Sequence, residues 1–142
     1  MKRSLFLFAL SAALAAPALA QPVTVSVEIT GVKASEGIIF GTLCAEGDGP
    51  FPGRCITYTG MAKAEQGTTS LGFFLVNPGR YALQVFHDED GNVMPDIQRE
   101  GMAFGNNITG RPTFEGAAIT VAGATTVSVA MRYPGAAEAS KE

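Results

Sequence analysis

The sequence has no tryptophan, one histidine, two cysteines and no cluster of lysine or arginine. A lone histidine cannot build a zinc site without cysteine or carboxylate partners, and no Gly-x-Ser-x-Gly motif is present to position a catalytic serine. The lack of basic clusters argues against nucleic acids and anionic membrane surfaces as partners. Beyond the first twenty residues, no stretch is continuously apolar enough to span a bilayer. The sequence therefore disfavours catalysis and predicts no nucleic-acid binding.

Residues 1–20 have the pattern of an export signal. Lys2 and Arg3 precede an apolar stretch over residues 5–14, and a small-x-small site, Ala18-Leu19-Ala20, ends before Gln21. Removing Lys2 and Arg3 leaves 8 basic residues against 13 acidic ones, a net charge of about −5. We expect a periplasmic or secreted bacterial protein with no membrane insertion after signal removal. One domain is expected over residues 21–134, followed by a disordered tail over residues 135–142.

The two cysteines, Cys44 and Cys55, form an even pair in an exported chain. Such a pair favours a disulfide over a metal or redox site, since oxidising compartments stabilise disulfides. The disulfide loop, residues 45–54, is rich in glycine and proline. Closing it would stabilise the fold by about 3 kcal/mol, chiefly by restricting the unfolded chain.

Apolar and polar residues alternate with a period of two along most of the mature chain, which is typical of half-buried strands. Short strands are expected at residues 23–29, 37–44, 55–59, 70–76, 80–87, 117–121 and 125–133. Seventeen glycines and eight prolines fit many turns. The pattern predicts an all-β fold, a seven-stranded antiparallel β-sandwich.

One connection, between the fifth and sixth expected strands, is unusually long. This long segment, residues 88–116, greatly exceeds an ordinary hairpin connection, and connections of that length are usually functional. Its large apolar side chains include Met94, Ile97, Met102, Phe104, Ile108 and Phe114. We expect the segment to fold back over one end of the sandwich and bury them.

The long segment opens with an acidic loop, residues 88–100. Asp88, Asp90, Asn92 and Asp96 have the offsets 1, 3, 5 and 9 of a calcium-binding loop. An EF-hand is rejected because Val93 replaces its glycine, Arg99 replaces its bidentate glutamate, and no helices flank the loop. Glu100, one position after Arg99, takes the place of that glutamate only if the backbone path differs from that of an EF-hand loop. Two interpretations stay open: a calcium site of another geometry, and a polar turn whose side chains cap their own backbone amides.

Five residues are candidates for binding a ligand or ordering the long segment: Glu100, His87, Asn106, Asn107 and Arg111. His87 is expected half-buried at the sandwich rim, on the same strand face as Tyr81, with its ring hydrogen-bonded to the long segment. Asn106 and Asn107 either fix the segment through bonds to backbone groups or present amides to a ligand. Arg111 is expected to pair with the acidic loop.

Several stretches of the second half resemble the exported bacterial family called domain of unknown function 2141. They are Pro78–Ala82, Val85–Asp88, Gly101–Asn107 and Arg111–Ala117. The resemblance implies an exported transthyretin-like or immunoglobulin-like sandwich of unassigned function. Two departures stand out: family members often carry glycine where this chain has Val93, and serine where it has Gly105.

Three functions are compatible with these patterns. The first is an exported non-catalytic module that binds an unknown protein, glycan or small molecule through the long segment, with a cation ordering the acidic loop. The second is a structural cell-envelope protein with no ligand. The third, a transthyretin-like hydrolase, is disfavoured because it needs several converging histidines and basic residues. We take the first as the working hypothesis.

Overall fold

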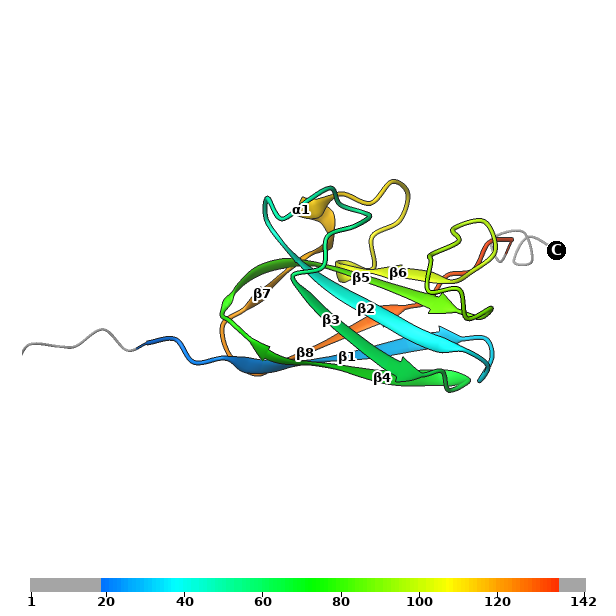
Figure 1. Ribbon diagram of the computed structural model, residues 1–142, viewed down its shortest axis with the longest axis horizontal. Helices are drawn as coiled ribbons and strands as arrows, with labels where there is room; N and C mark the ends of the chain where they lie inside the picture. Colours follow the sequence, from blue (N-terminus) through cyan, green and yellow to red (C-terminus); the bar gives the residue numbers. More distant parts are fainter. Residues whose placement is uncertain (1–18, 136–142) are drawn as a thin grey trace, which may run out of the picture.

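The computed structural model describes residues 19–135, which form eight strands and two short helices (Figure 1). In chain order they are β1 (Val23–Val32), β2 (Ile38–Ala45), β3 (Tyr58–Lys63), β4 (Gly67–Val76), β5 (Gly79–Asp88), β6 (Met102–Phe104), the 3-10 turn η1 (Gly105–Asn107), α1 (Phe114–Ala117), β7 (Ala118–Val121) and β8 (Thr125–Ala130). Nearly all of the expected signal peptide and tail lies outside the described residues.

The strands form two sheets packed face to face, which confirms the predicted sandwich. The smaller sheet has the order β4-β1-β8, and the larger one has the order β3-β2-β5. Two short strands share the far edge of β5, with β7 pairing along Gly79–Ala82 and β6 along Gln84–Phe86. The β1–β8 pair is parallel, so the expectation of a purely antiparallel sandwich is wrong for that pair.

The alternating pattern of β1 places its apolar side chains in the core. Val25, Val27 and Ile29 are fully buried, whereas the intervening residues face solvent. Across the sandwich they belong to the same apolar cluster as Leu83 and Val85 of β5. Burying each such side chain contributes about 1.5–3 kcal/mol, so this layer stabilises the sandwich substantially.

The strand count and one strand's position differ from those expected. The eighth strand is β6, which the long segment contributes, and β3 begins at Tyr58 rather than at Cys55. In β3, Gly60 pairs with Gly41 of β2, and the side chain of Leu71 from the smaller sheet packs against both glycines. Glycine has low strand propensity, so the β3 sequence gives a weak strand signal although tertiary packing places it in the sheet.

Strand β5 is buried on both faces, because the larger sheet is covered on its outer side. From Tyr81 to Asp88 every residue is buried. Figure 1 shows the disulfide loop, α1 and the acidic loop rising from this same side of the sheet. The predicted Cys44–Cys55 disulfide is present, with the two Cα atoms 5.3 Å apart. It belongs to a second apolar cluster that lies outside the sandwich core.

The second part of the long segment, from Phe104 on, therefore packs over the outer face of the larger sheet, whereas the acidic loop lies at the end of β5 (Figure 1). Phe104, Ile108 and Phe114 pack partly buried against the second cluster, as expected. The expectation of burial is wrong for Met94 and Ile97, whose side chains are 66% and 70% exposed. These two side chains lie in the acidic loop, which polar contacts hold in place.

Within residues 19–135, no helix has the length and apolar character required to cross a membrane.

Candidate functional site

Asp88, the last residue of β5, is the anchor of the acidic loop. Its carboxylate is buried, and Oδ1 accepts hydrogen bonds from the backbone N–H groups of Gly91 at 2.9 Å and Asn92 at 3.2 Å. Oδ2 accepts a third bond from the N–H of Val93 at 3.1 Å. Because strand side chains alternate, Asp88 points away from the core that Val85 joins, and the chain turns around its carboxylate.

Glu100 closes the acidic loop from its other end. The residue is 4% exposed, and its two carboxylate oxygens accept backbone N–H groups from different parts of the loop. Oε1 accepts from Glu89 at 3.1 Å, and Oε2 accepts from Asp96 at 3.0 Å. One buried side chain thus ties the beginning of the loop to its end, which fixes the loop shape without an apolar core.

Asp88, Asp90 and Glu100 bring carboxylate oxygens together to within 4.8 Å of one another. Hard cations bind carboxylate oxygens at about 2.0–2.6 Å, so two ligand oxygens on one ion lie at most about 4–5 Å apart. A carboxylate offers about four lone-pair positions, so the hydrogen bonds to backbone groups leave capacity for a cation. Asp88 and Glu100 are buried and Asp90 is exposed. This acidic triad could bind a metal ion.

The triad differs from the predicted ligand set. Asp88 and Asp90 do come together, but Asp96 does not join them: its Oδ1 accepts the N–H of Gln98 at 2.9 Å, and Oδ2 lies 3.8 Å from Nε of Arg99. The spacing of the sequence did not predict Glu100 as a main member of the ligand set. The reason is that the backbone of this loop follows a different path from that of the EF-hand loop, on which the offsets are based.

Asn92 acts within the loop as a turn residue. Its Nδ2 donates to Asp90 Oδ2 at 3.0 Å, and its Oδ1 accepts the N–H of Met94 at 2.7 Å. Both the polar-turn interpretation and the metal interpretation of this loop therefore have a structural basis, in Asn92 and in the acidic triad respectively.

Val93 occupies a backbone conformation that suits glycine. Its φ is 60°, and its side chain is 61% exposed, so no packing compensates for the strain of a β-branched residue in the left-handed region. We expect Val93→Gly to raise the free energy of unfolding by about 1 kcal/mol, because the strain relieved exceeds the added chain entropy. Urea denaturation measures the change. Val93→Ala should raise the free energy of unfolding by less than Val93→Gly does. A loss of stability in Val93→Gly would contradict this account of the loop.

His87 is fully buried, not half-buried as expected, and its ring bonds to groups outside the long segment. Nε2 lies 2.7 Å from the carbonyl oxygen of Glu36, which accepts, so Nε2 carries the proton. Nδ1 lies 2.7 Å from the hydroxyl of Tyr133, which in turn accepts the N–H of Lys33. Burial raises the pKa of Tyr133, whose hydroxyl stays protonated and donates to Nδ1. Both ring nitrogens of His87 are thus used to join three parts of the chain.

Asn106 and Asn107 fix the long segment through backbone groups. Both have φ values in the left-handed region, 57° and 52°, which asparagine tolerates. Nδ2 of Asn106 donates to the carbonyls of Gly116 and Ala118 at 2.9 and 2.8 Å. Oδ1 of Asn107 accepts the N–H of Ala130 at 2.7 Å, so its amide pairs with the β8 edge. Of the two interpretations of these residues, the structure supports the first.

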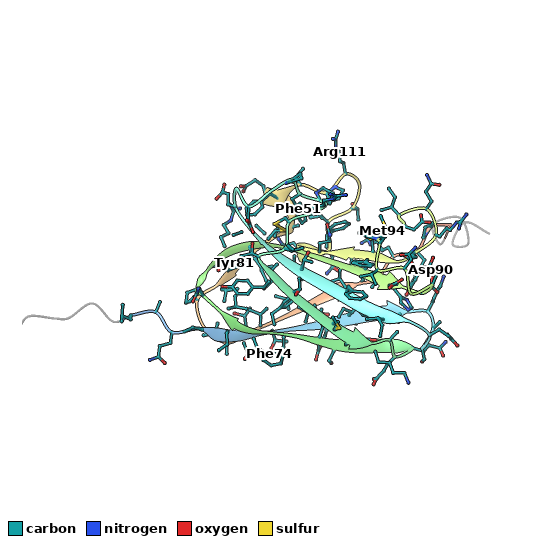
Figure 2. The ribbon with its side chains drawn as sticks, viewed as in Figure 1. Phe51, Phe74, Tyr81, Asp90, Met94 and Arg111 are labelled. Carbon is teal, nitrogen blue, oxygen red and sulfur yellow. A yellow bond between two sulfur atoms is a disulfide. The ribbon has the colours of Figure 1, made fainter. Side chains whose placement is uncertain are left out.

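The expected pairing of Arg111 with the acidic loop is wrong. Arg111 is exposed and points away from the body of the protein in Figure 2, and no ion pair involving it occurs among residues 19–135. The long segment is tied to β5 by a different arginine: Arg80 donates to Glu115, and this hydrogen bond holds the pKa of the Glu115 carboxyl below its ordinary value. The pair is exposed and contributes little.

A pocket of about 380 Å³ lies between the long segment and the chain that follows β8. Its apolar lining includes Ile97, Met102, Phe104, Ile108, Pro112 and Tyr133. Arg132, Asn107 and Glu100 are among its polar lining residues. A smaller hollow of about 150 Å³ shares Pro52, Ile97 and Met102 with it. The lining comes from three separate parts of the sequence, so no local pattern signals it.

Residues 27–129 match the family described as uncharacterized proteins conserved in bacteria, DUF2141, and the chain belongs to this family. The match confirms the resemblance drawn from the sequence. No curated protein matches the chain, and neither does any solved structure.

Proposed function

We propose that this member of the family is an exported, non-catalytic binding module on a transthyretin-like or immunoglobulin-like sandwich. Its pocket takes a small-molecule ligand, and a calcium ion orders the acidic loop that forms one wall of the pocket. The observation that carries the proposal concerns Glu100, which belongs to the acidic triad and also lines the pocket. A cation at the triad therefore acts directly on the pocket wall.

Export is supported by the disulfide between Cys44 and Cys55, since such bonds persist in oxidising compartments. A non-catalytic role is supported by His87, whose two ring nitrogens are both engaged and whose side chain is fully buried. A general base must reach its substrate, and a histidine in this position lacks that access.

Calcium suits the triad better than magnesium. Calcium accepts six to eight oxygen ligands in flexible geometry, whereas magnesium demands a near-ideal octahedron. The triad supplies oxygens from a loop, and the exposed Asp90 leaves one side open to water ligands. The compartment outside the cytoplasm supplies calcium at concentrations that even a weak site can use.

Calcium is expected to raise the melting temperature of the protein relative to buffer with a chelator. At free calcium 100-fold above the dissociation constant, binding to the native state adds about 2.7 kcal/mol, which corresponds to roughly 10 °C for a domain of this size. Asp90→Asn should remove most of the rise, because it takes one carboxylate from the triad. Asp96→Asn should leave the rise intact, because that carboxylate bonds to Gln98.

Differential scanning calorimetry of the wild type, Asp90→Asn and Asp96→Asn, together with a control variant, distinguishes the ligand sets. Glu28→Gln is the matched control, since it removes an exposed carboxylate from β1, which belongs to the other sheet. Equal melting with calcium and with chelator would overturn the calcium part of the proposal. A rise lost in Asp96→Asn and kept in Asp90→Asn would instead restore the ligand set inferred from spacing.

A further inference from the structure

Arg132 is the positively charged residue that lines the apolar pocket. Its backbone is fixed on the pocket wall by a two-residue bridge to Met102, in which each N–H donates to the other residue's carbonyl at 2.9 Å. The strand-like pairing fixes the backbone from which the side chain starts, and the exposed Arg132 side chain lies at the solvent-accessible side of the lining.

Within residues 19–135, the guanidinium of Arg132 makes one hydrogen bond, from Nη2 to the carbonyl of Asn107 at 3.5 Å. A guanidinium carries five N–H donors, so most of them have no protein acceptor in this part of the chain. No carboxylate of residues 19–135 lies within ion-pair distance of it. Glu100, the acidic residue of the lining, turns both of its oxygens to backbone N–H groups of the acidic loop.

A positive charge with free donors on an apolar wall points to a ligand of matching chemistry. We propose that the pocket binds a small amphipathic carboxylate, whose apolar body packs against Met102, Phe104 and Ile108 and whose carboxylate is held by Arg132. Guanidinium groups suit carboxylates because two parallel N–H donors match two oxygens. The volume of about 380 Å³ lies at the lower end of small-molecule pockets, which fits a compact ligand. This inference rests on the pocket of the proposed function and names its ligand class.

Calcium at the triad favours such a ligand. Because Glu100 belongs to the pocket wall and to the triad, the negative charge of the triad repels an incoming carboxylate. A bound cation offsets that charge. Carboxylate binding is therefore tighter in calcium than in chelator, and by linkage the carboxylate tightens calcium binding by the same factor.

Isothermal titration calorimetry with decanoate and 1-decanol, both below their aggregation concentrations and with calcium present, tests the ligand class. Decanoate should bind about tenfold more tightly than 1-decanol. Arg132→Gln should weaken decanoate about tenfold and leave 1-decanol unchanged, because only the ionic contact is lost. Arg99→Gln is the matched control: it removes the same charge from a side chain that is 85% exposed and does not line the pocket.

A second pair of variants tests the location. Ile97 lines both hollows and is 70% exposed, so Ile97→Asp should weaken both ligands without unfolding the protein, whereas Ile56→Asp, at a 64% exposed position outside the lining, should weaken neither. Equal affinities for the two ligands, or an unchanged affinity in Arg132→Gln, would overturn the carboxylate inference. If Ile97→Asp still abolished binding, pocket binding itself would stand. Binding of neither ligand, together with a retained calcium shift, would overturn the ligand class and leave the calcium site.

Discussion

Replacing Asp88 with alanine is expected to lower the free energy of unfolding by about 3 kcal/mol and to disorder the acidic loop. The buried carboxylate accepts three backbone N–H groups, from Gly91, Asn92 and Val93. Hydrogen bonds to a charged group contribute about 1.5–3 kcal/mol each, and water recovers part of the loss because these three residues are exposed. Urea denaturation of the wild type and Asp88→Ala measures the loss in free energy of unfolding.

Amide hydrogen exchange locates the effect of the Asp88 substitution. The N–H groups of residues 91–93 should lose protection, while those of β1 stay protected. Asp88→Asn keeps one oxygen acceptor, so its free energy of unfolding should lie between those of the wild type and Asp88→Ala. Asp96→Ala is the control, since it removes a half-buried carboxylate with one backbone bond and should change stability by less than about 1 kcal/mol. An Asp88→Ala protein as stable as this control would show that the loop does not depend on its anchor.

Replacing His87 with phenylalanine is expected to destabilise the protein by about 3 kcal/mol although a planar aromatic ring is kept. The substitution removes the fully buried imidazole that bonds the carbonyl of Glu36 and the hydroxyl of Tyr133. Each polar group left without its partner costs about 1–3 kcal/mol, and water recovers part of this loss because Glu36 is exposed and Tyr133 is half-buried. Thermal and urea unfolding measure the loss, and a near-neutral result would contradict the role of His87 as a polar connector.

A double-mutant cycle with Tyr133 separates the two hydrogen bonds of His87. Tyr133→Phe removes one hydroxyl and should cost about 1–2 kcal/mol, since it leaves Nδ1 of His87 and the N–H of Lys33 without a partner. The double variant should lose less than the sum of the single losses, because the two side chains share one bond. Strict additivity would mean that they act independently.

The fold was predictable where the sequence pattern is local. The alternation of Val25, Val27 and Ile29 predicts a half-buried strand, and the paired cysteines predict a disulfide; both are present. The parallel pairing of β1 with β8 was not predictable, because it joins distant strands without a hairpin or turn signal. The strand β6 was missed because its three residues acquire their extended form by pairing with β5.

The candidate site was predictable in composition but not in geometry. The density of oxygen ligands in the acidic loop indicated an ion site or a polar turn, and Asp88 and Asp90 belong to the acidic triad that the structure shows. Glu100 replaces Asp96 because it reaches back to the loop's first amide, a contact that depends on the path of the backbone. The pocket could not be predicted, since it forms between segments that meet only after folding.

The most direct test of the account is a crystal grown with calcium and examined by anomalous scattering. We predict one strong peak within about 2.6 Å of carboxylate oxygens from Asp88, Asp90 and Glu100, beside the wall of the pocket. No peak at saturating calcium, or a peak bound by Asn92 and Asp96 and remote from Glu100, would contradict it.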